Sequence, residues 1–304
     1  MRARASGVGS MVEEGSGYVT VDGYRLFYRS FGRDGRRPTV LGLHGGPGGC
    51  HDYLLPLADL AERGYRLVLF DQLGCGRSDV PADRSLFTLD HHVTETEEVR
   101  RALGLGRVHL LGSSYGGLLA IAVALQHPEG VRSLTTVGGL ASVPLASAEM
   151  TQLRLALPRD VQATLDRCEA AGTTASPQYQ AACMEFYRRH LCRLWPWPEE
   201  VTRTLEMAAQ RPVYAYMNGP SEFTITGTIR DIDLSPQLGR IQLPTLVLGG
   251  RFDEVTPTVA DQIRNGIPGA RGVTFPNSSH LPFWEEREAF LEVLDRFLTS
   301  VDEP

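Results

Sequence analysis

Short apolar runs rich in β-branched and aromatic residues recur along this chain, and amphipathic stretches separate most of them. Strands that alternate with helices predict an α/β fold, with a mostly parallel sheet covered by helices on both faces. Asp22-Gly23 lies between the first two runs and predicts a hairpin, so the sheet is expected to start antiparallel. The runs are Tyr18–Val21, Leu26–Phe31, Val40–Leu43, Leu67–Phe70, Val108–Leu111, Leu134–Val137, Leu246–Leu248 and Val273–Phe275.

The alternation stops between residues 141 and 230. This stretch is rich in helix formers and holds no obvious strand of a parallel sheet. We interpret it as a helical cap over the carboxyl ends of the strands, where α/β sheets bind ligands. The predicted organisation is a core of residues 18–140 and 231–304, a cap of residues 141–230, and a loose, polar, glycine-rich tail of residues 1–17.

Composition mainly excludes several classes of protein. The formal net charge of −6 argues against a nucleic-acid partner, because such proteins carry a basic face. No run approaches the roughly 18 apolar residues of a membrane helix, and the first residues lack the apolar segment of a signal peptide. We therefore expect no membrane partner. The five cysteines follow no disulfide framework, so we expect free thiols and a cytoplasmic location. His91-His92 lacks a plausible ligand set, so we predict no metal and no cofactor.

The segment Gly112-Ser113-Ser114-Tyr115-Gly116 matches the pattern G-x-S-x-G. An apolar strand precedes it and a helix-forming run follows it, which is the context of a nucleophile elbow with Ser114 as the nucleophile. The pattern alone also occurs by chance in glycine-rich turns. A second glycine-rich turn, His44-Gly45-Gly46-Pro47-Gly48, ends an earlier strand, where the elbow fold places its other oxyanion donor.

A base and an orienting acid are expected after the serine, in the order Ser, Asp or Glu, His. Of the three later histidines, His127 lies at a helix stop and His190 in a charged helical stretch. His280 ends a polar loop after a strand and is the predicted base. Thr245–Gly250 reads as a late strand, and two acids follow it closely. Asp253 is the better candidate for the orienting acid, and Glu254 is its rival.

Together these pieces resemble the α/β-hydrolase superfamily, which implies an α/β-hydrolase fold with an inserted helical cap. Within it, the His-Gly-Gly-Pro-Gly turn is similar to the proline iminopeptidases of peptidase family S33. The segment Asn218-Gly219-Pro220-Ser221-Glu222-Phe223 resembles the tricorn-interacting aminopeptidase branch. Two further segments support the likeness, Asp71 to Ser78 and Gly250 to Glu254.

The resemblance implies a role for each matching position. The nucleophile, orienting acid and base correspond to Ser114, Asp253 and His280. The oxyanion donors correspond to the N–H groups of Gly46 and Tyr115. The acids that bind the substrate's free amine correspond to Glu222 and Glu254. Without the resemblance, Glu222 and Glu254 read as ordinary solvated acids.

The expected function is a serine aminopeptidase that releases an N-terminal residue, proline or a similar residue with a free amine, from short peptides or amides through an acyl-enzyme. Its partner is then a small substrate with a free amine, and the sequence does not indicate an oligomeric state. One alternative is an amino-acid amide or ester hydrolase in a specialised pathway. An alternative of another class is a non-catalytic ligand receptor on a hydrolase scaffold.

Overall fold

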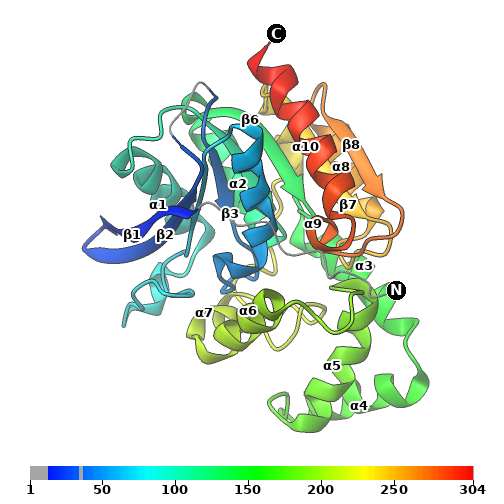
Figure 1. Cartoon of the computed structure of the whole chain (residues 1–304). Helices are drawn as coiled ribbons and strands as arrows, with labels where there is room; N and C mark the ends of the chain where they lie inside the picture. Colours follow the sequence, from blue (N-terminus) through cyan, green and yellow to red (C-terminus); the bar gives the residue numbers. More distant parts are fainter. Residues whose placement is uncertain (1–12, 34–36, 304) are drawn as a thin grey trace, which may run out of the picture.

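The computed structural model describes residues 13–33 and 37–303, and it contains an eight-stranded sheet (Figure 1). The strand order is β1-β2-β4-β3-β5-β6-β7-β8. Strand β2 runs antiparallel to β1 and β4, and the other neighbours are parallel, which confirms the mostly parallel sheet. Asp22 and Gly23 have φ values of 49° and 84° in the predicted hairpin. The strands are β1 (Glu13–Val21), β2 (Tyr24–Phe31), β3 (Val40–Leu43), β4 (Leu67–Phe70), β5 (Val108–Ser113), β6 (Val131–Val137), β7 (Thr245–Gly250) and β8 (Arg271–Phe275).

Strand β1 begins earlier than the apolar pattern indicates. It starts at Glu13, so residues 13–17, expected in the tail, belong to the sheet, while residues 1–12 lie outside the described residues. The extension pairs through its backbone with β2, and Gly17 lies opposite Tyr28. Backbone pairing needs no apolar side chain, so the sequence pattern gave no signal there.

Helices cover both faces of the sheet, as Figure 1 shows. No helix within residues 13–33 and 37–303 is long and apolar enough to cross a membrane. The α-helices are α1 (Leu89–Ala102), α2 (Tyr115–Gln126), α3 (Val143–Leu155), α4 (Arg159–Ala170), α5 (Pro177–His190), α6 (Glu199–Gln210), α7 (Pro212–Met217), α8 (Pro257–Gly266), α9 (Pro282–Glu285) and α10 (Arg287–Asp302), and the 3-10 helices are η1 (His51–Arg63), η2 (Arg84–Leu86), η3 (Pro128–Gly130) and η4 (Ser235–Arg240).

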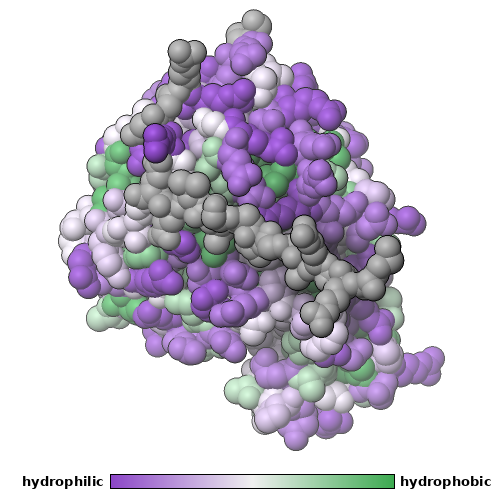
Figure 2. All heavy atoms as spheres, viewed as in Figure 1, coloured by the Kyte–Doolittle hydropathy of each residue, from purple (hydrophilic) through white to green (hydrophobic). Residues whose placement is uncertain are grey.

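Strand β4 shows how the sheet builds two cores. All four of its residues are buried, and successive side chains point to opposite faces. Val68 and Phe70 belong to the apolar cluster that contains residues of α1, α2 and α8. Leu67 and Leu69 belong to a second cluster that contains residues of η1 and α10. Polar residues dominate the outer face in Figure 2, where apolar residues are scattered in small groups.

Helices α3 to α7 lie between β6 and β7 and fall within residues 141–230, a segment called here the helical insert. Its helices begin at side-chain caps and prolines: the Ser176 hydroxyl accepts a hydrogen bond from the N–H of Tyr179, and Pro177 follows the cap. The insert meets the sheet domain at the loop after β3, where Gly48 leaves room for the backbone of Tyr214. Figure 1 shows α4 to α7 below the sheet.

The turn from β5 into α2 packs directly on β3 and admits only glycine. A Cβ on Gly116 would overlap the carbonyl of Leu43, and a Cβ on Gly112 would overlap the carbonyl of Gly116. Because these neighbours are backbone atoms of the central strand β3 and of helix α2, they cannot move aside at low cost.

We therefore expect Gly116→Ala to lower the free energy of unfolding by about 3 kcal/mol or more, because overpacking a dense site forces backbone shifts. Thermal unfolding measures the change. Gly239→Ala is the matched control, since the nearest atom to its added Cβ lies 4.0 Å away. Equal melting temperatures for the two variants would show that the turn tolerates a side chain.

Candidate active site

Ser114 lies at the turn where β5 ends and α2 begins. Its φ and ψ are 58° and −126°, a strained conformation for a residue other than glycine. Such strain persists only where the surroundings enforce it, and the close packing of Gly112 and Gly116 does so here. The strand-turn-helix context predicted for the elbow is therefore present.

Asp253 and His280 follow the neighbouring strands β7 and β8, and the structure brings them together. The Nδ1 atom of His280 lies 2.6 Å from Oδ1 of Asp253, and both side chains are buried. The same Asp253 oxygen accepts the N–H of Val255 at 2.8 Å. Gly138 makes room for the pair, because a Cβ there would lie 2.6 Å from Nδ1 of His280.

The electrostatic surroundings of His280 favour its protonated form. Burial lowers the pKa of His280, but the charges of Asp253, Glu254 and Glu222 outweigh burial and raise the pKa to about 10. The carboxylates act strongly because little water separates them from the ring.

The glycine-rich turn after β3 lies against Ser114. Gly46 has a φ of 116°, in the region that favours glycine, and a Cβ on Gly45 would lie 2.7 Å from the Cβ of Ser114. The N–H of Gly45 donates a hydrogen bond to the hydroxyl of Tyr53 at 2.8 Å, which fixes the turn. Tyr115 is the first residue of α2, where backbone N–H groups lack partners within the helix.

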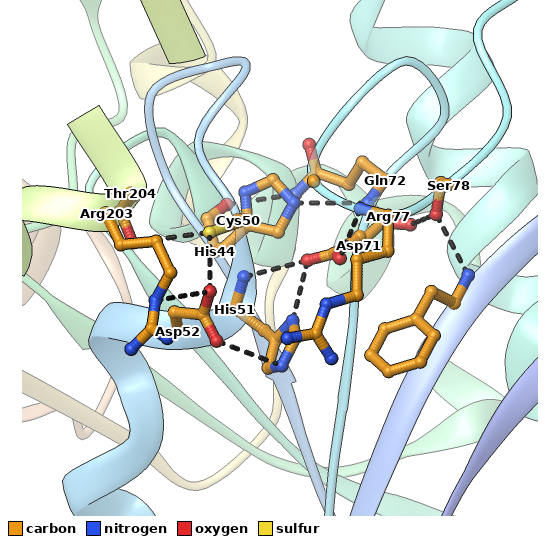
Figure 3. A network of polar contacts seen from close by, with 12 residues as sticks. His44, Cys50, His51, Asp52, Asp71, Gln72, Arg77, Ser78, Arg203 and Thr204 are labelled. Atoms are coloured by element: carbon orange, nitrogen blue, oxygen red, sulfur yellow. Dashed lines mark hydrogen bonds and ion pairs between the residues drawn. The ribbon is translucent and has the colours of Figure 1, made fainter. Parts of the chain in front are cut away.

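A buried polar network holds this turn from behind (Figure 3). Burial lowers the pKa of His44, so its ring is neutral. Its Nδ1–H donates to the carbonyl of Gly45 at 2.9 Å, and its Nε2 accepts the N–H of Gln72 at 3.1 Å. Asp71 accepts both the backbone N–H and Nδ1–H of His51, each at 2.8 Å. The network therefore ties the turn to the end of β4.

The same network reaches α6 of the helical insert. Cys50 Sγ lies 3.3 Å from the Thr204 hydroxyl, and Arg203 Nε lies 3.4 Å from a carboxylate oxygen of Asp52. Burial raises the pKa of the Cys50 thiol to about 12, so this cysteine is a packing group and no nucleophile.

Glu222 sits on a loop whose shape the Asn-Gly-Pro-Ser-Glu-Phe segment determines. The amide of Asn218 donates to the carbonyl of Ser221 at 2.8 Å, and Gly219 has a φ of 137°. The carboxylate of Glu222 accepts the hydroxyl of Tyr214 at 2.8 Å. Burial raises the pKa of Glu222.

Glu254 is completely buried beside the predicted base. One of its carboxylate oxygens lies 3.8 Å from Nε2 of His280, and neither oxygen has a hydrogen-bond partner among the described residues. Burial raises the pKa of this carboxyl well above its usual range; the charge of His280 lowers the pKa, and the charges of Glu222 and Asp253 raise it further. A buried charge without a partner is costly, so this carboxylate suits a cationic ligand.

Two cavities meet at these groups and share Gly46, Ser114, Glu222 and Glu254. His280 and several residues of α6 line the first cavity, while Tyr115 lines the second. The remaining walls of the second cavity are mostly apolar: Leu118, Leu140, Met150, Ile225, Ile229 and Val255, with Asn218. The structure thus gathers all the predicted site residues, with Asp253 behind the ring of His280.

His190, rejected as a base from the sequence, has a different place in the site. As the last residue of α5, its carbonyl has no N–H partner further along that helix. The backbone N–H groups of Glu254 and His280 both donate to it at 3.2 Å. Its Nδ1–H donates to the carbonyl of Phe252 at 2.9 Å. His190 therefore fastens both loops to the helical insert, and no local sequence pattern signals such backbone contacts.

Among the residues the structure describes, a group with metal-ligand spacing consists of Glu97, His127 and Glu129. The Glu97 carboxylate already pairs with Arg100 and Arg101, each at 2.7 Å. Because two guanidinium groups offset the charge of this carboxylate, we do not assign a metal site to these three residues.

Comparison with known proteins agrees with this geometry. A family model described as the alpha/beta hydrolase fold matches residues 38–287, so the class defined by fold and site is an α/β-hydrolase. A proline iminopeptidase of Saccharolobus solfataricus is 46% identical over 95% of this chain and 93% of its own length. That of Thermoplasma volcanium is 43% identical over 93% and 96%.

Two solved structures are similar over nearly the whole chain. The crystal structure of VinJ has a TM-score of 0.93 at 40% identity, and the proline iminopeptidase of Mycobacterium smegmatis has a TM-score of 0.87 at 36% identity. Each comparison covers 95% of this chain and 99% of the other. The chain belongs to the proline iminopeptidase family of α/β-hydrolases.

The role of His190 is testable by exchanging its side chain. His190→Leu removes the donor to Phe252, so we expect kcat for hydrolysis to fall roughly 10- to 100-fold with a small change in KM, because the acid and base loops lose alignment. His190→Asn keeps an N–H donor and should recover most of the rate. Arg189→Ala, on the exposed neighbouring residue, is the control. A His190→Leu enzyme with normal kcat and an unchanged pH profile would contradict this role.

Proposed function

We propose that this chain is a serine aminopeptidase that releases an N-terminal residue, proline or a residue of similar shape with a free amine, from short peptides. The observation that carries the proposal is the pair of carboxylates, Glu222 and Glu254, in the cavities that contain Ser114. An internal residue of a peptide has no charged amine, so acids at this position select the chain end. Relatives named proline iminopeptidases support the same assignment.

The chemistry begins with attack of Ser114 Oγ on the carbonyl carbon of the scissile bond. Nε2 of His280 takes the serine proton, and Asp253 holds Nδ1–H and stabilises the imidazolium that forms. His280 then gives the proton to the leaving amine as the carbon–nitrogen bond breaks. Water, activated by the same histidine, attacks the acyl-enzyme and releases the amino acid.

Charge that develops on the carbonyl oxygen needs donors that are already in position. In the proposal these are the backbone N–H groups of Gly46 and Tyr115, which lie beside Ser114 in the second cavity. Loss of one such donor typically raises the barrier by about 3 kcal/mol. The buried network behind Gly45 supports this role, because donors act best when they need not reorganise.

The second cavity suits the side chain of the released residue. Its walls include Leu140, Met150 and Ile229, and it shares both acids with the first cavity. A small apolar ring such as that of proline buries its carbons there while its secondary amine, charged near neutral pH, faces Glu222 and Glu254. The apolar walls also exclude water, which strengthens the ion pairs.

In the proposal, the helical insert of residues 141–230 acts as the cap that closes the site, and residues 18–140 and 231–304 form the catalytic core. Contacts of α6 with the first cavity and of His190 with the loops of Glu254 and His280 support this division. A cytoplasmic location is proposed as well, supported by five buried, free cysteines.

A second candidate is hydrolysis of an amino-acid amide or ester. The observation that favours it is the first cavity, whose wall from the helical insert consists largely of Leu191, Val201, Leu205 and Ala208 and includes no arginine. The carboxylate of a dipeptide would meet no arginine on that wall, whereas an apolar leaving group would fit. Comparing kcat/KM for proline dipeptides with that for proline arylamides separates the two candidates.

The triad is tested by Ser114→Ala, His280→Ala and the double variant. Each single change should lower kcat on proline arylamides by several orders of magnitude, and the double change should add little, because the groups act as a unit. Circular dichroism confirms that each variant is folded. Near-normal turnover by folded Ser114→Ala would end the hydrolase assignment, and a wild type with no turnover and no labelling of Ser114 would favour a receptor.

A further inference from the structure

The position of Glu254 has a consequence beyond binding an amine. Its carboxylate lies 3.8 Å from Nε2 of His280, the nitrogen that must accept the proton of Ser114. Both Glu254 oxygens are buried without a hydrogen-bond partner among the described residues. A protonated His280 is therefore a favourable neighbour for Glu254, and a neutral one leaves the carboxylate uncompensated.

The charged groups around His280 are mostly carboxylates. The described residues that line the two cavities include no arginine. The charge of His280 counteracts the effect of burial on the carboxyl groups of both Glu222 and Glu254. Several titratable groups face this region from the elements packed around it. They are Asp253 and Glu254 after β7, Glu222 after α7 with Tyr214 and Tyr187 beside it, His190 at the end of α5, Tyr53 in η1, and Glu285 in α9, which binds Ser279.

We infer that Glu254 keeps His280 protonated, and so inactive as a base, until the ammonium group of a substrate occupies the pocket. This inference rests on the proposed function. When the ammonium lies between Glu222 and Glu254, it supplies the positive charge that the imidazolium supplied before. The proton of His280 then passes to solvent, and neutral Nε2 is free to accept the proton of Ser114.

The same residue then serves both recognition and activation. A substrate without a charged amine binds more weakly and also finds the base protonated. Water in the empty site meets the same protonated base, so the nucleophile is activated only when the correct chain end is bound. The raised pKa of His280 agrees with this geometry, because a raised pKa also favours the protonated ring.

The test uses the full-length enzyme and an uncharged fluorophosphonate. This probe forms a phosphorus–oxygen bond with Ser114 and loses fluoride, and it needs His280 to accept the serine proton. In the wild type, we expect slow labelling at pH 7 that accelerates as pH rises. Glu254→Gln keeps the shape and removes the charge, so labelling at pH 7 should rise about tenfold or more and its pH midpoint should fall by about one unit or more.

The variant should lose kcat/KM on proline arylamides at the same time, because it binds the amine less well. Glu185→Gln, at a half-buried acid on α5, is the matched control and should change neither rate. Equal pH midpoints for labelling of Glu254→Gln and wild type, with arylamide turnover still reduced, would overturn the inference and leave the proposed function standing. A wild type that neither labels at Ser114 nor cleaves arylamides would instead overturn the proposed function.

A measurement on the wild type covers the case in which Glu254→Gln does not fold. The ring C–H signal of His280, assigned by its loss in His280→Asn, is titrated by nuclear magnetic resonance with and without prolinol, a cationic proline analogue that has no scissile bond. We expect the midpoint to fall when prolinol is bound. An unchanged midpoint at saturating prolinol would contradict the inference.

Discussion

The carboxyl ends of the parallel strands lie along one edge of the sheet, and the proposed triad and the glycine turn depend on that alignment. The glycine turn follows β3, Ser114 follows β5, and Asp253 and His280 follow β7 and β8. Hydrogen bonds between strands fix the spacing of these ends, so residues more than 160 positions apart in the chain meet at one edge. The glycines at the turns permit this closeness, because side chains there would overlap backbone.

Around that edge the protein concentrates negative charge. Asp253, Glu254 and Glu222 surround one histidine, and burial disfavours the ionised form of both glutamates. Such an arrangement costs folding stability, a cost that is typical of functional sites. In the proposed function a substrate ammonium supplies the missing cation, so recognition of the chain end and the state of the base would both follow from one electrostatic imbalance.

The helical insert contributes more than a cover. His190 fixes the loops of Glu254 and His280, α6 lines the first cavity, and Thr204 contacts the network behind the glycine turn. The position of the insert is thus coupled to the acid, to the base and to the proposed oxyanion donors. A displacement of α5 or α6 would alter the geometry of the reacting groups as well as access to them.

Much of this was predictable from sequence because it is local. Alternating apolar runs predicted the sheet. Such runs precede Ser114, Asp253 and His280 in the expected order, and this order predicted that the three residues lie together. The start of β1 at Glu13 was not predictable, since that pairing is made by backbone groups. The role of His190 was missed for the same reason, because its hydrogen bonds to Glu254 and His280 use its backbone carbonyl. Glu222 depended on resemblance, because its position follows from the fold of a distant loop.

The most direct test of amine recognition compares proline arylamide with its N-acetyl derivative on the wild-type enzyme. Acetylation removes the positive charge and leaves Glu222 and Glu254 unpaired, which typically costs 2–5 kcal/mol, or about 30- to 5,000-fold. We predict that kcat/KM for the acetylated substrate is lower by at least about 100-fold. Equal kcat/KM values for the two substrates would contradict the claim that these acids recognise a free amine.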